Sequence, residues 1–321
     1  MKYKLLPAAI AIAAATTITS SAIAEGLTVY GKANLSLNKV DLESNGDDQW
    51  DLTSNASRIG VKGSYKINDS IKAIYKFEYE VFIDDGDDGK DSNSEFKQRN
   101  IYAGFQGNFG TIVAGNHDTP LKMAQGKVDK FNDLQEGDIK NVLEGENRES
   151  NIIMYTTPKF GDFSATAAFI PGESDAEDGI ADGVSISLNY KIDNLSLALA
   201  NDNDVDGWDL TRAVAEYSMG DAKVGLLIQD GEESNGTKDQ DGYVLSGEYK
   251  INKWVLKAQY ASSDSEDGAF NDETEQIAIG VDYKLNKKTK LFAYLSTVDS
   301  EDATGNNIED QVFGMGYELK F

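Results

Sequence analysis

Apolar and polar side chains alternate along most of the chain, and this period of two constrains the fold more than any other feature. In segment 70–82, the odd positions from Ile71 to Val81 are apolar or aromatic, and the even positions include Lys72, Lys76, Glu78 and Glu80. Segments 243–251, 254–260, 277–285 and 313–321 alternate in the same way. Because successive side chains of a strand point to opposite faces, the alternation predicts an all-β chain.

The connectors between these segments also alternate, short and then long. Seven short connectors have tight-turn composition, and eight longer ones are rich in acids. Fifteen connectors predict sixteen strands in one antiparallel sheet, and no linker divides the chain after residue 24. The short turns are 66–69, 107–110, 158–162, 191–194, 220–222, 250–253 and 284–287; the long loops are 41–55, 84–95, 117–147, 171–182, 201–207, 230–241, 262–274 and 299–307.

A soluble sandwich would also alternate, but three features favour a closed barrel in an outer membrane. The face opposite the apolar one is strongly charged, the turns are short at one end only, and the chain ends on an aromatic residue, Phe321. A closed barrel pairs every backbone group, as lipid requires. With sixteen strands the lumen is too wide for side chains to fill, so we expect an aqueous channel.

The N-terminus resembles a secretory leader. Lys2 and Lys4 precede a short apolar run, 5–15, and Ala22-Ile23-Ala24 has the small residues of a cleavage site. We therefore expect a signal peptide over 1–24 and one barrel domain over 25–321. Cleavage would change the formal net charge from −25 to −27.

The charge and the absence of cysteine exclude several classes. A chain this acidic would repel nucleic acid, and without cysteine neither a disulfide scaffold nor a cysteine zinc site can form. Of the 55 acids, 43 fall in or beside the eight long connectors. They either keep exposed loops soluble or concentrate cations at the pore mouth, and from the second possibility we expect a cation preference.

Two other groups were considered as sites. Segment 202–207 begins like a calcium loop, but position twelve is Ala213 where a bidentate glutamate is needed. His117 is the only histidine, and no motif adds a serine and an acid to it. We therefore predict no metal site, no cofactor and no enzyme.

Segment 117–147 is too long for a simple hairpin connection. It carries lysines among its acids and has a moderately apolar side, so it can pack against another surface. The inside of the barrel wall is the expected place, where this third long loop would fold inward and narrow the lumen.

Five motifs in order make the chain resemble the general, non-specific porins of Gram-negative outer membranes, over essentially its whole length. Each motif alone is weak, but their order is specific. They are Val29–Ala33, Ser57–Gly63, Arg99–Phe105 with its continuation to Gly115, Arg148–Asn151 with Tyr155–Gly161, and the C-terminal Tyr317–Phe321.

The resemblance implies a homotrimer and a pore constriction in which basic wall residues oppose acids of the third loop. It implies contact with outer-membrane lipid and lipopolysaccharide, recognition by the barrel-assembly machinery through Phe321, and passage of ions and small hydrophilic solutes. Alternation also places Lys32 and Arg58 on the polar face, but leaves the face of Arg99 ambiguous. The implied wall residues are Lys32, Arg58, Arg99 and Arg148, and the implied loop acids are Asp129, Asp133, Glu136 and Asp138.

Three alternatives stay open. A substrate-specific channel would need an aromatic track along the lumen, but the aromatic residues mostly share the apolar face, as in the girdles of membrane interfaces. A barrel enzyme would need a site around His117. An adhesive or structural barrel would not conduct. For Arg148, a simple ion pair with Glu146 or Glu149 is the competing interpretation.

Overall fold

The computed structural model describes residues 26–85, 96–172, 179–267, 270–301, 305 and 307–321. The expected signal peptide lies outside these residues, as do most of the acidic segment 84–95 and half of segment 171–182.

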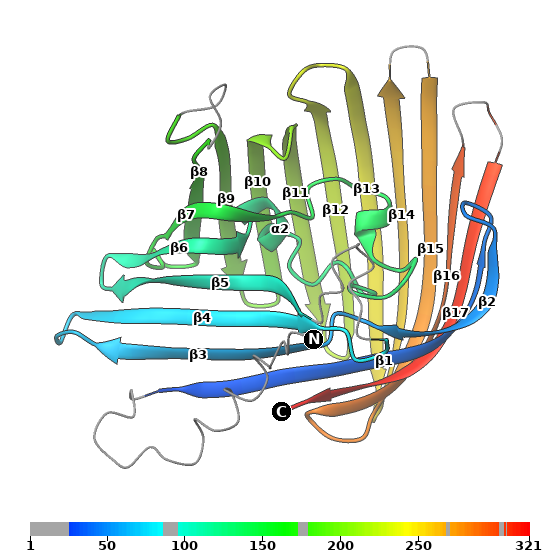
Figure 1. The fold of residues 1–321 in the computed structure, drawn as a ribbon, viewed down its shortest axis with the longest axis horizontal. Coiled ribbons are helices and arrows are strands. Elements are labelled where there is room, and N and C mark those ends of the chain that lie inside the picture. The colour runs from blue at the N-terminus through cyan, green and yellow to red at the C-terminus, as the bar shows by residue number, and fades with distance from the viewer. Residues whose placement is uncertain (1–25, 86–95, 173–178, 268–269, 302–304, 306) are drawn as a thin grey trace, which may run out of the picture.

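Strands make up nearly all of the described chain (Figure 1). The helical elements of the described residues lie between β6 and β7: α2, Pro120–Ala124, and the 3-10 turn η1, Ile139–Asn141. The strands are β1 Thr28–Leu42, β2 Asp47–Ser54, β3 Arg58–Lys66, β4 Ile71–Val81, β5 Phe96–Gly107, β6 Gly110–Asp118, β7 Arg148–Thr156, β8 Phe163–Ile170, β9 Gly183–Ile192, β10 Leu195–Val205, β11 Trp208–Met219, β12 Ala222–Glu233, β13 Lys238–Ile251, β14 Trp254–Asp267, β15 Phe270–Lys284, β16 Thr289–Glu301 and β17 Asn307–Lys320.

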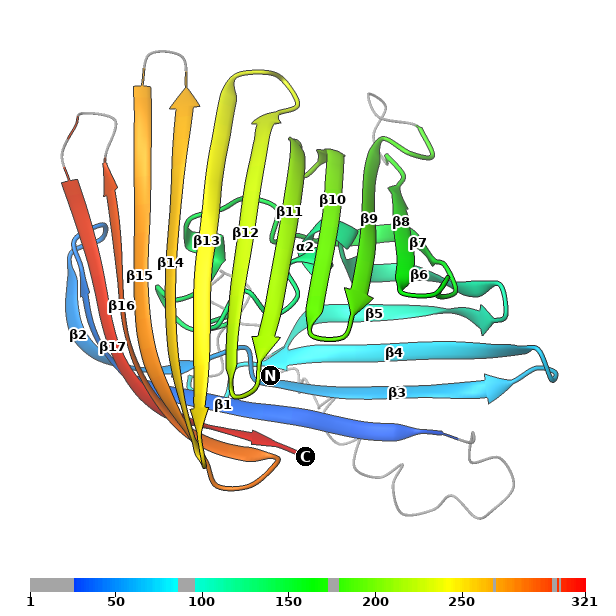
Figure 2. The same cartoon turned by 180° about the vertical axis from the view of Figure 1, so that it is seen from behind.

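The strands form one antiparallel sheet that closes on itself. From β3 onward each strand pairs with its neighbour in sequence, and β1 pairs with β17 from Lys32↔Lys320 to Leu42↔Asp310. β2 and β3 both pair with β1, one after the other, so they are two halves of one barrel strand. The described strands therefore form the sixteen-stranded barrel that the sequence predicts (Figures 1 and 2).

The alternation of the sequence becomes the two faces of this barrel. In β17 the side chains of Phe313, Met315, Tyr317 and Leu319 are exposed, whereas Val312, which points to the opposite face of the same strand, is buried. The exposed large apolar side chains lie on nearly every strand, which fits an outer surface that contacts lipid. The opposite, concave face carries most of the polar and charged side chains.

Several expected long loops are mainly strand. The connectors at the long-loop end include 43–46, 206–207 and 234–237, and the acidic residues around them extend the hairpins. In segment 202–207, Asp206 and Gly207 form a two-residue turn with φ of 54° and 78°, as a type I′ hairpin requires. The segment is therefore a hairpin and not an ion-binding loop. The backbone hydrogen bonds between paired strands form beyond the membrane as well as within it. A change from apolar to acidic side chains therefore does not end a strand.

Among the described residues, the 119–147 segment is a long connector that keeps loop character. Thr119 caps α2, because its hydroxyl accepts a hydrogen bond from the Lys122 amide at 3.1 Å, and Pro120 fits the first helical turn. The segment packs against the concave face, with Phe131 beside Ala278 and Phe292, and Leu121 beside Leu210. Figure 1 places it within the curve of the sheet.

Most of the buried apolar clusters join this segment to β10–β17. Among the described residues, no helix has the length and apolar character needed to cross a membrane.

Candidate functional site

Lys32 and Arg58 lie side by side at the start of the site. They are directly opposite each other in β1 and β3. Arg58 follows the break between β2 and β3, where Ala56 has a φ of 48°. The Arg58 Nε donates to the Ala56 carbonyl at 3.0 Å, and the hydroxyl of Ser57 accepts from the Asn34 amide at 2.9 Å. The break therefore fixes where the guanidinium projects from the concave face.

A β-bulge resolves the face of Arg99. The register of β4 and β5 shifts between the pairs Phe77↔Ile101 and Tyr79↔Gln98, so β5 has one extra residue there. Arg99 can then contact Glu78 at 3.3 Å and Glu80 at 2.9 Å on the concave face. Simple alternation would have grouped it with the outward Ile101, which is why the sequence left it ambiguous.

Arg148 pairs with an acid that the sequence did not single out. Its partner is Asp118, directly opposite in the β6–β7 register and 2.7 Å away. The Arg148 Nε also donates to the Asn100 side chain at 3.1 Å. Neither Glu146 nor Glu149, the two acids expected as alternatives, makes this ion pair. Glu146 instead binds Arg212.

Among the four acids named from the sequence, Asp133 makes the most direct contact with the wall. Its Oδ2 accepts from the Lys32 Nζ at 2.7 Å and from the Arg58 guanidinium at 2.6 Å. Its φ is 69°, and its own amide donates to the Asp138 carboxylate at 2.9 Å. Burial alone would raise the pKa of Asp133, but Lys32 and Arg58 outweigh it and hold this pKa below its usual range.

The other three loop acids have different roles. Asp138 caps η1 by accepting from the Lys140 amide at 3.1 Å. Glu136 lines the cavity, and burial followed by the Asp310 charge raises its pKa. Asp129 does not line the cavity: its carboxylate accepts from backbone amides of its own segment, at Phe131 and Ile139. Burial, and after it the Asp138 charge, raises the pKa of Asp129 well above its usual range.

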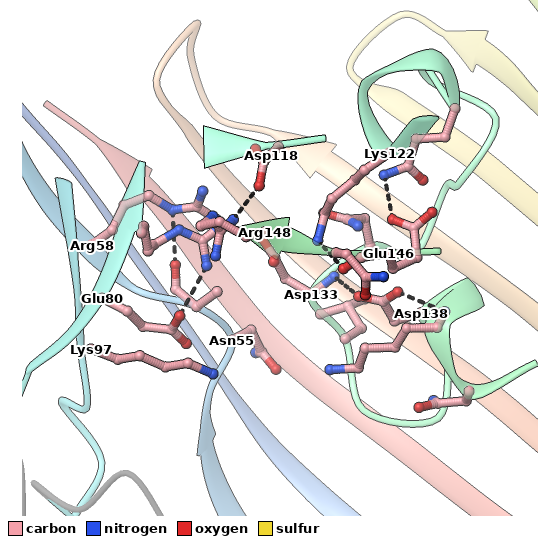
Figure 3. Close-up of a pocket in the computed structure, with 18 of the residues that line it drawn as sticks. Asn55, Arg58, Glu80, Lys97, Asp118, Lys122, Asp133, Asp138, Glu146 and Arg148 are labelled. Atoms are coloured by element: carbon pink, nitrogen blue, oxygen red, sulfur yellow. Dashed lines mark hydrogen bonds and ion pairs between the residues drawn. The ribbon is translucent and has the colours of Figure 1, made fainter. Parts of the chain in front are cut away.

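The residues gather around one cavity of about 1000 Å³. Figure 3 shows side chains of the wall on one side of the cavity: Arg58, Glu80 and Arg148. Side chains of the 119–147 segment lie on the other side: Lys122, Asp138 and Glu146. Asp133 lies between the two groups. Lys32 contacts Asp133 but does not itself line the cavity. The lining is rich in amides and, among the described residues, has no aromatic side chain.

A row of carboxamides on adjacent strands binds the backbone of the 119–147 segment. Gln259 accepts from the Lys130 amide at 2.8 Å and donates to the Gly137 carbonyl at 3.1 Å. Gln276 donates to the carbonyls of Glu136 and Asp138, both at 3.0 Å. The full row comprises Gln229 of β12, Gln240 of β13, Gln259 of β14 and Gln276 of β15.

Arg212 anchors the end of the same segment. Its side chain is fully buried and pairs with Glu146 at 2.7 Å, and it donates to the Glu144 carbonyl at 3.0 Å. Sequence reasoning missed Arg212, the glutamine row and the wall acids Glu78, Glu80 and Asp118. Their only signal is position: the glutamines, Glu78 and Glu80 occupy the polar phase of alternating strands, whereas Arg212 shares its phase with Trp208, Leu210 and Val214.

The described residues offer little for enzyme or metal chemistry. The Nδ1 of His117 lies 2.8 Å from the Asp118 carbonyl oxygen, and its ring lies beside that of Tyr102; neither contact involves a serine. No group of three or more histidine, cysteine or acidic residues in the described part of the chain could hold a metal ion.

Comparison with known proteins decides the family. A family model described as Gram-negative porin matches residues 8–303. The chain belongs to the Gram-negative porin family. This porin is 28% identical over 310 residues to outer membrane porin protein 32 of Delftia acidovorans, covering 87% of this chain and 84% of that one. It is 27% identical over 296 residues to outer membrane protein U of Vibrio parahaemolyticus, covering 84% of this chain and 83% of the relative.

A solved structure, the anion-selective porin from Comamonas acidovorans, superposes with a TM-score of 0.76 at 22% identity, covering 92% of this chain and 99% of the other. Family membership assigns the chain to the outer membrane and to channels rather than enzymes. The expected all-β barrel, porin family and outer-membrane location are therefore confirmed.

Proposed function

We propose that this porin is a water-filled diffusion channel for ions and small hydrophilic solutes, narrowed by the 119–147 segment. The observation that carries the proposal is the contact of Asp133 with Lys32 and Arg58, which are 101 and 75 residues away in sequence. The glutamine row binds the segment to β12–β15, and Asp133 connects it to β1 and β3 through an ion pair with each strand. The rest of the opening is the cavity beside it.

The constriction acts through charge and hydration. Arg99 and Arg148 are paired with carboxylates of their own wall, and Arg58 is paired with Asp133. Paired charges and amides can replace part of the hydration shell of a passing solute without holding it tightly. Small hydrophilic solutes pass, whereas large or apolar ones find no compensation and are excluded. The absence of aromatic side chains among the described lining residues favours this general channel over a substrate-specific one.

We further propose that the channel prefers cations at low salt. The formal charge of −25 and the acids on the hairpins at the long-loop end would concentrate cations at the mouth. An anion preference is the competing possibility, favoured by the basic wall and by the fold shared with a porin described as anion-selective. Reversal potentials across a planar bilayer under a salt gradient distinguish the two, and clear anion selectivity would overturn this part of the proposal.

Variants of the wall test the constriction itself. Replacing Arg58 and Arg99 together with alanine should widen the opening and remove two positive charges, so unit conductance and cation preference should both rise. Lys39→Ala is a matched control, because Lys39 lies on the outer face opposite Trp50 and Phe313. Unchanged conductance in the double variant would remove these two arginines from the constriction.

A homotrimer is proposed from membership in a family whose members generally form trimers. Chemical cross-linking followed by electrophoresis without heating tests the trimer, and a monomer under those conditions would contradict it.

We also propose that Phe321 serves the barrel-assembly machinery, and that the outer face contacts lipid and lipopolysaccharide. Phe321 closes the barrel by exchanging backbone hydrogen bonds with Gly31, and its ring covers that residue, where a side chain would collide. Truncation of Phe321 should slow assembly, and normal assembly of the truncated chain would contradict its role as a signal.

A further inference from the structure

Charged side chains of the concave face are sorted along the barrel axis. Near the short turns, lysines lie directly opposite lysines on neighbouring strands. This part of the lumen therefore has a concentrated positive charge. Like charges directly opposite each other destabilise the sheet, so such pairs are unusual. The opposed pairs are Lys32↔Lys320, Lys62↔Lys76, Lys66↔Lys72 and Lys284↔Lys290.

Register and contacts place these lysines in the lumen. Lys32 reaches Asp133, and Lys290 pairs with Asp282, whose cross-strand neighbour is the buried Phe292 of the concave face. Carboxylates neutralise only part of the set. Lys250 belongs to the same face, because it lies opposite the buried Val255 in the β13–β14 register. Among the described residues, no ion pair within 4.0 Å involves Lys62, Lys72, Lys250 or Lys284.

The long-loop end has the opposite sign. Asp47 and Asp310 both lie opposite Leu42, a buried residue of the concave face, and Asp51 lies opposite Asn38. Glu136 joins them from the 119–147 segment. On the outer face of β12–β17, at the same end of the barrel, acids oppose acids in register: Asp230↔Asp241, Asp241↔Asp264, Asp264↔Glu273, Glu275↔Asp299 and Asp299↔Glu309.

We propose that this axial separation of charge makes the channel a rectifier, which conducts more current in one direction than in the other. The inference rests on the proposed channel function and goes beyond it. A negatively charged mouth is rich in cations and a positively charged vestibule is rich in anions. A voltage that drives both toward the constriction fills it with ions, whereas the reverse voltage depletes it.

The direction follows from the sign of each end. Short turns face the periplasm in outer-membrane barrels, so the acidic end faces outside. The current is then larger when the extracellular side is positive. At that voltage, cations from the mouth and anions from the periplasmic vestibule both move toward the constriction. The effect depends on overlapping ion atmospheres. It is therefore expected where the Debye length is about 10 Å, at about 0.1 M salt, and not where it is about 3 Å, at about 1 M.

The test is the current–voltage curve of single channels whose orientation is known. Because the chain has no cysteine, Ser44→Cys at an extracellular turn provides one biotinylation site, and one-sided avidin then reports the orientation. At about 0.1 M KCl we expect currents at equal and opposite voltages to differ by about twofold, with the ratio approaching one at about 1 M KCl as screening shortens the Debye length. A linear curve at low salt, or larger current with the periplasmic side positive, would overturn the inference.

A triple variant, Lys72→Gln, Lys250→Gln and Lys284→Gln, should abolish the asymmetry and shift selectivity toward cations. The matched control is Lys253→Gln, Lys287→Gln and Lys288→Gln. It removes the same charge from the same end, but Lys253 lies over the outward Tyr283 and the other two are in a turn. Equal loss of rectification in both variants would contradict a luminal origin. A chain that does not conduct at all would instead overturn the proposed function.

Discussion

The two halves of the barrel wall use the same alternating pattern for different purposes. In β1–β7 the concave face carries charged side chains that pair within the wall, such as Arg99 with Glu80 and Arg148 with Asp118. In β10–β17 it carries carboxamides and apolar residues that hold the 119–147 segment, such as Gln259 and Leu227. The first half forms a charged surface that lines the cavity, and the second forms the surface on which the 119–147 segment packs. A period of two therefore sets which residues face inward, and their chemistry sets what that face does.

The largest expected effect comes from the anchor of the docking half. Arg212→Met leaves Glu146 buried without its partner, and losing one member of a buried pair costs about 3–5 kcal/mol. We expect a lower unfolding temperature by circular dichroism and a noisier channel. Arg212→Met combined with Glu146→Gln removes both charges and should recover much of the loss. If the double variant were as unstable as the single one, the ion pair would not be the cause.

The glutamine row predicts a smaller effect on the same half. Gln259→Leu with Gln276→Leu removes hydrogen bonds to four backbone groups of the segment, each contributing about 0.5–1.5 kcal/mol. Barrel unfolding should change little, but single-channel recordings should acquire frequent brief closures as the segment moves. Gln106→Leu is the control, since Gln106 binds Thr111 of the neighbouring strand. Quiet recordings from the double variant would show that other contacts suffice.

Asp133 connects the two halves, so its replacement tests the contrast between them. Asp133→Asn leaves Lys32 and Arg58 without their shared carboxylate. Conductance should rise and selectivity should move toward anions, as measured by reversal potential. Asp129→Asn removes an acid only four residues away that does not line the cavity, so its selectivity should match the wild type. Identical shifts in the two variants would contradict the distinction.

The smallest effect is in the pH dependence of these two aspartates. The pKa of Asp133 lies below its ordinary value of about 3.9. Its ion pairs with Lys32 and Arg58 are therefore retained at that pH and are lost only as the pH falls further. The pKa of Asp129 is raised, so the stability it contributes is lost as pH rises through its folded pKa. Unfolding temperatures measured upward from about pH 4 should decline less in Asp129→Asn than in the wild type. Parallel curves would contradict this assignment.

Sequence predicted the barrel well because strand count, faces and short turns all follow from alternation and turn composition. Alternation placed Arg58 on the polar face but left Arg99 ambiguous, because one extra residue breaks the period in β5. The bulge before Asn100 turns Arg99 inward and leaves no composition signal. Sequence also overestimated loop length, because acids can continue a strand in water. Partners across the sheet, such as Asp118 for Arg148, depend on register that a single sequence does not specify.

In the proposed channel, the cavity between the 119–147 segment and the charged wall is the narrowest part of the conducting path. Asn132 lines this cavity, and the absence of native cysteine lets a single introduced thiol report alone. Single-channel current of Asn132→Cys should drop in a discrete step when a bulky cationic thiol reagent is added, whereas Ser44→Cys at the outer turn should not respond. Unchanged current after verified modification of Asn132→Cys would contradict the account.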